Sequence, residues 1–210
     1  MANPTDPDSG ILKTRRGWVQ GDNAQIVVTP DQIILAADVT TEANDTHQLT
    51  GMLDQAQAAV EAVIGEQAVL GAAVADAGYW SQANTATATE ECELFIATQK
   101  DRKQRAALRE APPPRGRLPK TMTARERMDR KLRTKRGRAF YRQRGGAVEP
   151  VFGQMKERQG AGRFSMRGLE RCRGEWQLDA AVHNLRKLHR DSVRHLENQG
   201  NGRRRAAKAA

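Results

Sequence analysis

The chain has little of several features that would define its class. Only two of its 210 residues are cysteines, Cys92 and Cys172, and they lie far apart in the sequence. This excludes a disulfide scaffold and a cysteine-based zinc module, and it fits a reducing, cytoplasmic environment. No apolar run approaches the ~18 residues of a membrane span, and the N-terminus shows no secretory signal pattern. We therefore expect no membrane partner.

Aromatic residues and metal-binding motifs are also scarce. Aromatic residues make up 4% of the chain and hydrophobic residues 38%, which predicts a modest core. The four histidines form neither an HxxxH nor an HExxH pattern, and no glycine-rich run follows a predicted strand. Zinc-hydrolase chemistry and P-loop nucleotide hydrolysis are therefore not indicated.

Acidic residues become scarce in the second half of the chain. Residues 1–100 carry 4 basic and 14 acidic groups, whereas residues 101–210 carry 31 basic and 11 acidic groups. Such a surplus of positive charge repels itself unless a polyanion neutralises it. The basic segments lack the strong apolar face of an interfacial helix, so nucleic acid is favoured over a membrane surface.

The first hundred residues alternate strand and helix patterns. Apolar runs at 24–29 and 32–40, separated by Pro30 and Asp31, predict a β-hairpin. Residues 45–65 have helical spacing, with Asp45 and Gln48 as a capping box and Gly65 at the end. A buried strand over 68–75, a helix over 81–91 and a strand over 94–97 follow. This order predicts a mixed sheet with helices on its faces.

The remaining residues are basic and mostly helical. A capping box, Thr123 with Glu126, predicts a helix to about 138, and Gly145 with Gly146 interrupts the pattern. Further helices are predicted over 150–158 and 168–197. We divide the chain into an irregular N-terminal segment (1–16), a sheet portion (17–99), a basic Pro-rich linker (100–122), a basic helical region (123–199) and a disordered basic tail (200–210).

Asp76 is the first candidate for chemistry. It follows the predicted buried strand 68–75, at the carboxyl end where α/β sheets bind ligands and metals. The alternative is structural, because an Asp at a strand–helix junction often caps the helix that follows.

Glu149 is the second candidate. Pro150 suits the first turn of a helix, which would leave Glu149 at the helix start and stabilised by the helix dipole. Its functional interpretation rests on Arg144 and Lys156, because a carboxylate flanked by cations can meet both a metal ion and a phosphate backbone.

These residues carry a family resemblance. The stretch ADAGY at 75–79, followed by Tyr141, Arg144, Glu149 and Lys156, resembles the DDE-type transposases of bacterial insertion sequences. The segments TDPDS, GWVQGDNAQ, VEPVFGQMKE and RFSMRGL are similar to that family as well. The resemblance implies an α/β fold: a partial RNase H-like mixed sheet with flanking helices. A basic, mostly helical C-terminal region follows this sheet in the sequence.

The resemblance also implies a function. The family carries out metal-dependent phosphoryl transfer, cleaving and joining DNA strands at transposon ends with three carboxylates that hold two Mg²⁺ or Mn²⁺ ions. Its implied partners are DNA with terminal inverted repeats and a second copy in a synaptic complex, in the cytoplasm at the nucleoid. The matching residues are Asp76 and Glu149 as catalytic metal ligands, and Tyr141, Arg144, Lys156, Arg163 and Arg167 as DNA-binding residues.

The chain departs from the family at the first carboxylate. The family's first catalytic Asp lies on a strand that we expect before residue 1, so the chain resembles a truncated transposase. Asp38, Asp6 and Asp8 are the internal substitutes. Two alternatives stay open: a non-catalytic, basic nucleic-acid-binding remnant, and a chain that folds poorly because the missing strand exposes a sheet edge.

Overall fold

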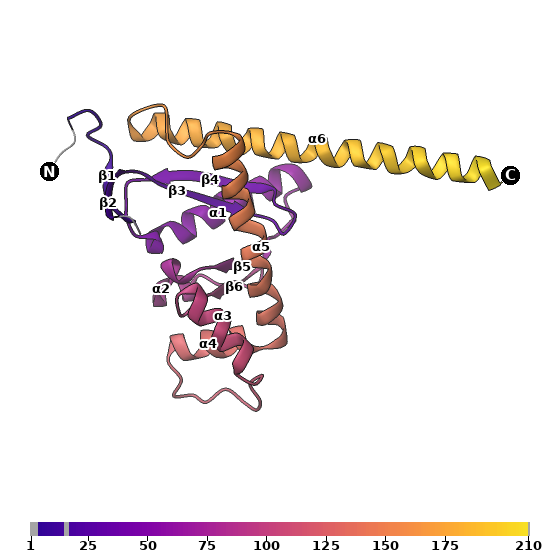
Figure 1. Cartoon of the computed structure of the whole chain (residues 1–210). Coiled ribbons are helices and arrows are strands. Elements are labelled where there is room, and N and C mark those ends of the chain that lie inside the picture. The colour runs from indigo at the N-terminus through magenta and orange to yellow at the C-terminus, as the bar shows by residue number, and fades with distance from the viewer. Residues whose placement is uncertain (1–3, 15–16, 210) are drawn as a thin grey trace.

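The computed structural model describes residues 4–14 and 17–209, and its elements surround two cores that share helix α5 (Figure 1). The long helix α6 crosses the upper half, and the lower half holds the shorter helices. The predicted α/β class is confirmed.

The strands are β1 (Gly10–Thr14), β2 (Gly17–Gly21), β3 (Asn23–Val28), β4 (Ile34–Thr40), β5 (Gly71–Ala75) and β6 (Cys92–Ile96). The helices are α1 (Gln48–Ile64), α2 (Gln82–Ala86), α3 (Asp101–Glu110), α4 (Ala124–Arg133), α5 (Lys135–Arg158) and α6 (Leu169–Ala209), with 3-10 turns η1 (Asp45–His47) and η2 (Ala77–Tyr79).

A hairpin lies close to the N-terminus. β1 and β2 pair antiparallel, with Leu12 opposite Val19 and Lys13 opposite Trp18. The Lys13 ammonium lies 5.6 Å from the Trp18 ring centroid. Apolar and cation–aromatic pairs across strands favour this pairing. The prediction of an irregular segment over 1–16 is therefore wrong for Gly10–Thr14, while residues 1–3 and 15–16 lie outside the described residues.

The predicted hairpin of β3 and β4 is confirmed and forms the upper core. The two strands pair antiparallel, and helices cover both faces. On one face Trp176 of α6 and Val151 of α5 are fully buried against the hairpin. On the other face Met52 and Ala56 of α1 pack against Ala36. Burial of large apolar side chains on both faces stabilises this layer.

β5 and β6 form the lower strand pair. They run parallel, as the intervening helical segment predicts, although α2 is shorter than the predicted helix over 81–91. Phe95 of β6 is fully buried and packs with Leu132 of α4 and Tyr141 of α5. This second core places the carboxyl end of β5 beside α5.

The strands do not join into one sheet. Within residues 4–14 and 17–209 they form three separate pairs, β1–β2, β3–β4 and β5–β6. The predicted mixed sheet is therefore not formed among the described residues, because no strand bridges the β3 pair and the β5 pair. An RNase H-like sheet stays a prediction.

Helix α3 lies inside the segment predicted as a linker. Its inner face buries Gln104 and Leu108, and the Gln104 Oε1 accepts a hydrogen bond of 3.0 Å from the Thr98 N–H. Asp101 occupies the first turn and pairs with Arg105 one turn later at 2.8 Å. Both features favour a helix, so the linker interpretation of 100–122 is wrong over Asp101–Glu110.

The helix predicted from Thr123 to about 138 divides into two. The Thr123–Glu126 capping box is present, but α4 ends at Arg133 and Thr134 caps α5 by accepting the Gly137 N–H. A Cβ at Gly137 would lie 2.3 Å from the Lys131 carbonyl oxygen. This close approach of two backbones requires glycine, and it fixes the turn between the helices.

Helix α5 continues through Gly145, Gly146 and Pro150, where an interruption and a new helix start were predicted. The buried residues Tyr141, Ala147, Val151 and Met155 hold one face of the helix against both cores. Pro150 cannot donate to the Gly146 carbonyl, and the Gln32 Nε2 donates to that carbonyl instead, at 3.1 Å. Tertiary contacts thus outweigh the local breakers.

Helix α6 continues to Ala209, so residues 200–209 are helical and the predicted disordered tail is wrong there. Arginine, lysine and alanine are strong helix formers, which explains the continuation. Residue 210 lies outside the described residues. Among the described helices, none is both long and apolar enough to cross a membrane.

Candidate active site

Asp76 lies directly after β5, at the carboxyl end of the strand as predicted. Its Oδ1 accepts a 2.8 Å hydrogen bond from the Gly78 N–H, so it also caps η2. The structural interpretation of Asp76 is therefore confirmed. A cap leaves the second carboxylate oxygen available, so the cap and a functional role are compatible.

A second carboxylate, Asp45, approaches the same place. The predicted capping box of Asp45 is wrong, because Asn44 caps η1 and Asp45 Oδ1 instead accepts from Asn23 Nδ2 at 2.7 Å and Gln25 Nε2 at 2.8 Å. A Cβ at Gly78 would lie 2.7 Å from Asp45 Oδ2 and 3.0 Å from Asp76 Oδ1. The two carboxylates therefore flank one glycine. Sequence analysis missed Asp45 because its partners lie on a distant strand.

The carboxylate pair makes its surroundings electronegative. The hydroxyl of Tyr79 donates to Gln25 Oε1 between the two acidic residues. Burial, followed by the negative charges of Asp45 and Asp76, raises the pKa of Tyr79. A cation or a hydrogen-bond donor is therefore the complementary ligand at this point.

Arg144 supplies a cation to the cavity that these two carboxylates line, close enough for the charge of Asp76 to act on it. Its side chain is 11% exposed, and its guanidinium pairs with Asp101 Oδ1 at 2.6 Å. Burial would lower the pKa of Arg144, but the bond to Asp101 and the charges of Asp101 and Asp76 raise it. The Arg144 Nε is buried and has no hydrogen-bond partner among the described residues. A guanidinium fixed by an ion pair in this way is suited to bind an oxyanion.

Tyr141 holds Arg144 in place. It is 3% exposed, and its hydroxyl donates to the same Asp101 oxygen at 2.9 Å. Burial and the Asp101 carboxylate raise the pKa of Tyr141 to about 12. In this arrangement the Tyr141 ring contacts the lower core, so it acts by positioning Arg144.

Asp76, Asp45 and Arg144 line one cavity of about 400 Å³. The edges of β3 and β5, helix α1 and helix α5 surround it. The structure therefore brings two of the predicted site residues, Asp76 and Arg144, into one space.

Glu149 does not line that cavity. It lies in the middle of α5 and not at a helix start, its side chain is 64% exposed, and Arg105 Nη2 pairs with it at 3.3 Å. Among the described residues, no three His, Cys, Asp or Glu side chains form a group that could hold a metal ion. The residues as placed do not fit a two-metal site.

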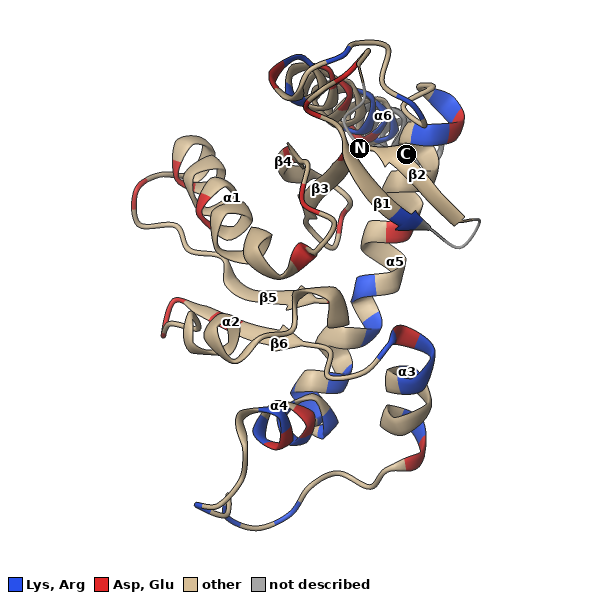
Figure 2. Cartoon of the chain, turned by 90° about the vertical axis from the view of Figure 1, so that its left-hand side faces the viewer, with Lys and Arg blue, Asp and Glu red and all other residues tan. Residues whose placement is uncertain are grey.

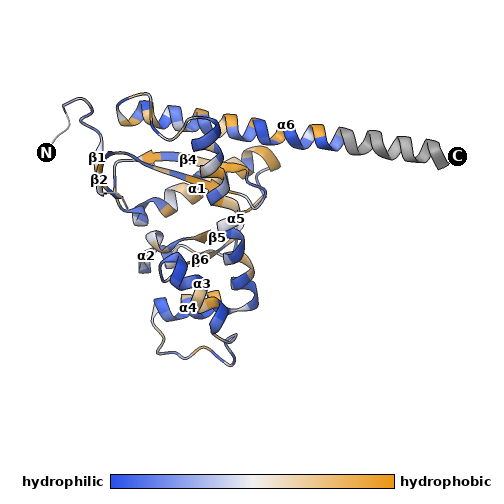
Figure 3. Ribbon diagram, viewed as in Figure 1, coloured by the Kyte–Doolittle hydropathy of each residue, from blue (hydrophilic) through white to orange (hydrophobic). Residues whose placement is uncertain are grey.

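The other predicted DNA-binding residues lie on the surface. Lys156 is exposed on α5, with its ammonium 5.5 Å from the Phe152 ring centroid. Arg163 and Arg167 are exposed in the segment between α5 and α6. Figure 2 shows basic residues on α3, α4, α5 and α6, and acidic ones on α1. The hydropathy of the ribbon follows the same division, with hydrophilic residues over much of α3–α6 (Figure 3).

The three substitute carboxylates have structural partners away from Asp76. Asp38 pairs with Arg173 Nε at 2.5 Å, and hydrogen bonds from Arg173, Val39 and Gln55 outweigh burial and lower the pKa of Asp38. Asp6 and Asp8 accept the N–H groups of Gly168 and Leu169 at 3.2 and 3.3 Å. Both N-terminal acids thus stabilise the start of α6.

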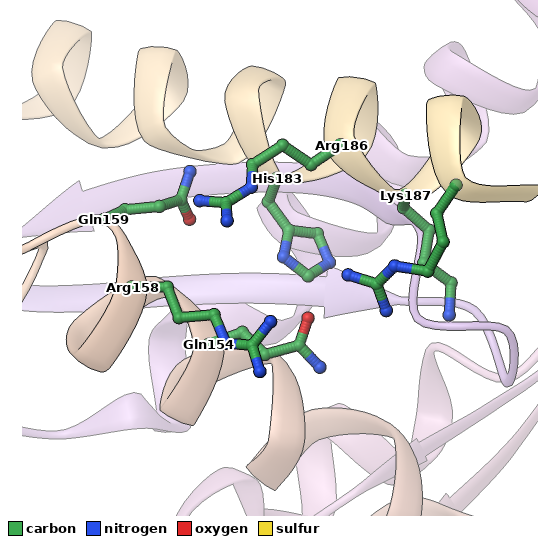
Figure 4. Close-up of a pocket in the computed structure, with 7 residues that line it drawn as sticks. Gln154, Arg158, Gln159, His183, Arg186 and Lys187 are labelled. Atoms are coloured by element: carbon green, nitrogen blue, oxygen red, sulfur yellow. The ribbon is translucent and has the colours of Figure 1, made fainter.

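A basic cluster that sequence analysis missed lies between α5 and α6. We call Arg158, Arg186, Lys187 and Arg190 the α5–α6 basic cluster, and Figure 4 labels Arg158, Arg186 and Lys187 beside His183. Within the described part of the chain, no carboxylate forms an ion pair with these four residues. The cavity between them is about 10 Å³, which suits surface contact with a polyanion and not an enclosed ligand.

His183 is buried beside this cluster. Its Nε2 lies 2.9 Å from the Gln32 carbonyl oxygen, so the ring contacts the chain's own backbone and does not lie on the surface. The signal for the cluster was the spacing of Arg186, Lys187 and Arg190, because residues three and four apart share a helix face.

Comparison with known families supports the resemblance. Residues 114–189 match the family model described as a transposase DDE domain. The matched segment includes Tyr141, Arg144, Glu149 and Lys156, so the match supports the resemblance to DDE transposases over this part of the chain. Comparison with curated proteins found no match, and neither did comparison with solved structures.

Proposed function

We propose that the chain acts on DNA as part of a DDE-type transposase, in strand cleavage and transfer at transposon ends. One observation carries the proposal. Arg144, inside the matched segment, is buried in the same cavity as Asp76, which lies outside that segment. Two residues that the family resemblance selected from distant parts of the sequence therefore share a site.

Phosphate binding is the chemistry that these side chains support best. Asp101 and Tyr141 fix the Arg144 guanidinium, and a guanidinium held in this way is suited to donate to a phosphate oxygen. The exposed Lys156, Arg163 and Arg167 then serve as contacts to the DNA backbone. Such contacts position the DNA and carry no sequence preference.

Strand cleavage requires more than these residues. Mg²⁺ or Mn²⁺ would supply the electrophilic chemistry, but Asp76 and Glu149 do not form a metal-holding group as placed. We therefore propose cleavage only for an assembly that adds a carboxylate and brings Glu149 away from Arg105. A homodimer bound to terminal inverted repeats, in the bacterial cytoplasm, is the proposed setting.

The second candidate function is a non-catalytic nucleic-acid-binding protein derived from a transposase. The separation of Glu149 from Asp76, and the α5–α6 basic cluster without carboxylate partners, favour it. Both functions require polyanion binding, so they differ only in whether the protein cleaves the DNA strand.

The experiment measures DNA binding and DNA nicking with one set of proteins. Fluorescence anisotropy of a labelled duplex in a salt series should give an affinity that falls steeply with salt. Replacing Arg158, Arg186 and Arg190 by Gln should reduce the salt slope, whereas the same change at the exposed Arg102, Arg109 and Arg171 is the charge-matched control. If the cluster variant and the control variant gave equal salt slopes, the basic cluster would not be part of the DNA interface.

Nicking of a supercoiled plasmid with Mg²⁺ or Mn²⁺ separates the two functions. A transposase activity should disappear in Asp76→Asn and Glu149→Gln, and persist in the matched surface variant Glu157→Gln. Binding without nicking, unchanged in Glu149→Gln, supports the non-catalytic protein. A chain that melts cooperatively and binds no duplex at low salt contradicts both.

A further inference from the structure

Helix α6 carries an apolar stripe on its solvent-facing side. Leu178, Val182 and Leu185 are spaced by four and three residues, and His189 continues this spacing. Leu178 and Leu185 are each 66% exposed, and the leucines share one helix face. Figure 3 shows apolar residues recurring along α6. Apolar residues that alternate at spacings of four and three are the pattern of a coiled-coil seam.

The stripe lies opposite the side of α6 that packs on the strands. Successive residues of an α-helix are about 100° apart, so Leu185 lies about 180° around the helix from Trp176. Trp176 and Ala180 are buried in the core that includes β4. Both ribbon views show α6 along the upper edge of the molecule (Figures 1 and 2). A second helix can therefore approach the stripe without meeting the strands.

Most basic residues beyond the stripe's centre lie away from it. Lys187, Arg190 and Arg194 lie within about 40° of the direction of Trp176, on the side opposite the stripe. A helix with positive charges on both borders of its apolar stripe would repel a second copy of itself. This distribution leaves Arg186 as the basic residue that borders the stripe.

Asp179 and Arg186 border the stripe on the same side. Each follows a stripe leucine by one position, and about 10 Å of helix separates the two residues. Within the described part of the chain, neither forms an ion pair. Burial, followed by the negative charge of Glu175, raises the pKa of Asp179. Both residues are therefore suited to a partner that carries the opposite charge.

We propose that α6 packs antiparallel against α6 of a second copy of this chain, with Leu178, Val182 and Leu185 in the seam. Val182 then lies opposite Leu185 of the second copy, and Asp179 lies opposite Arg186 of the second copy. The twofold axis passes between residues 183 and 184, so each contact occurs twice. On the other side of the seam, the small Ala181 faces Leu188 of the second copy.

The charge distribution along α6 favours the antiparallel direction. Glu175 and Asp179 precede the centre of the stripe, whereas Arg186, Lys187 and Arg190 follow it. Antiparallel pairing brings the acidic end of one helix to the basic end of the other, whereas parallel pairing aligns like charges. The stripe is as narrow as a coiled-coil seam, and a membrane interface requires a broader apolar face. A helix with the same stripe is therefore the complementary partner.

The seam is short, so the dimer is weak. Residues 178–189 span about 18 Å of helix, which buries less than the roughly 1,200 Å² of a standard interface. We expect a reversible dimer with a Kd of about micromolar or weaker. The proposed function invokes a second copy without a surface to hold it. This inference deepens that proposal by naming the surface, and the seam itself needs no DNA or metal.

Sedimentation equilibrium of the full chain, freed of nucleic acid, tests the seam at about 1 to 200 µM. The wild type should show a monomer–dimer equilibrium. Leu185→Glu places a charge in the seam and should weaken the dimer at least about tenfold. Ile64→Glu, at the exposed end of α1, is the matched control and should leave the equilibrium unchanged. A monomer at every concentration, or a dimer that Leu185→Glu leaves unchanged, overturns the proposal.

A charge exchange tests the direction and the register of the two helices. Asp179→Arg and Arg186→Asp should each weaken the dimer roughly three- to tenfold, because each places like charges across the seam. The double variant restores opposite charges across the seam and should recover the wild-type Kd. A double variant as weak as the single variants would contradict the antiparallel register.

The seam and the proposed function can fail independently. Leu185 lies outside the α5–α6 basic cluster and outside the 400 Å³ cavity, so Leu185→Glu should leave duplex binding at low protein concentration unchanged. A chain that stays monomeric and still binds duplex contradicts the seam alone. A dimer that responds to Leu185→Glu but binds no duplex contradicts the proposed function alone.

Discussion

Arg144 and Asp101 form a half-buried ion pair between α5 and the first turn of α3, with 2.6 Å between guanidinium nitrogen and carboxylate oxygen. The pair connects a segment predicted as a linker to the helix that carries the family signature. Because Tyr141 donates to the same oxygen, the pair sets where the Arg144 guanidinium lies in the cavity.

Asp101→Asn should destabilise the fold by about 1–2 kcal/mol, the lower range for a charged hydrogen bond, because Asp101 is about one-third exposed. Arg144 and Tyr141 lower the pKa of Asp101 against the effect of burial. Its contribution is therefore complete above the unfolded-state pKa of about 3.9 and disappears as pH falls through the lower folded-state pKa.

Urea unfolding between pH 7 and pH 3 tests this prediction. The wild-type protein should lose more stability toward pH 3 than Asp101→Asn loses. Asp54→Asn, an exposed change on α1, is the control and should follow the wild type. Parallel curves for the wild type and Asp101→Asn would show that the ion pair contributes nothing.

Two glycines of α5 should respond oppositely to alanine. Gly137→Ala places a Cβ against the Lys131 carbonyl and should cost about 1–3 kcal/mol, because backbone on both sides resists the change. Gly153 is exposed with open space around it, so Gly153→Ala should stabilise the helix by about 0.5–1 kcal/mol. Thermal melts of both variants measure whether each change raises or lowers the melting temperature. A higher melting temperature for Gly137→Ala would contradict the close backbone approach.

The Gln32 side chain should matter only while residue 150 is proline. Gln32→Ala removes the donor to the Gly146 carbonyl and should cost about 0.5–1.5 kcal/mol. Pro150→Ala restores a backbone donor to that carbonyl, so the cost of Gln32→Ala should shrink in its background. A double-mutant cycle by urea unfolding measures the coupling, and additive effects would mean that the bond has no role.

Divalent metal should not stabilise the isolated chain. The described residues form no three-ligand group. Raising the Mg²⁺ concentration about tenfold, at roughly millimolar levels, should therefore leave the melting temperature unchanged. Thermal melts of the wild type and of Glu149→Gln, each with Mg²⁺ and with EDTA, test this prediction. A rise in melting temperature that Glu149→Gln removes would show that Glu149 reaches Asp76 in solution.

Local sequence patterns predicted the elements that depend on nearby residues. The β3–β4 hairpin follows from two apolar runs and a Pro30 turn, and the Thr123–Glu126 capping box starts α4 as expected. The position of Asp76 after a strand also follows from an apolar run. Each of these features depends on residues within a few positions of one another.

The failures involve partners that are distant in sequence. Gly145, Gly146 and Pro150 predict an interruption, yet α5 continues because its face is buried and Gln32 satisfies the carbonyl that Pro150 cannot. The partners of Asp45 and Glu149, on β3 and α3, have no local sequence signal. The sequence contains no signal that Asp76 and Arg144 line one cavity, and none that places Glu149 outside it.

Helix α5 belongs to both cores, through Val151 and Met155 above and Tyr141 below. With no strand pairing between the β3 and β5 pairs in the described chain, this helix is a main connection between them. Helix α1 also packs against both strand pairs, with Leu49 against β6 and Met52 against β4. Side-chain packing, and not strand pairing, therefore couples the two cores when the chain is heated.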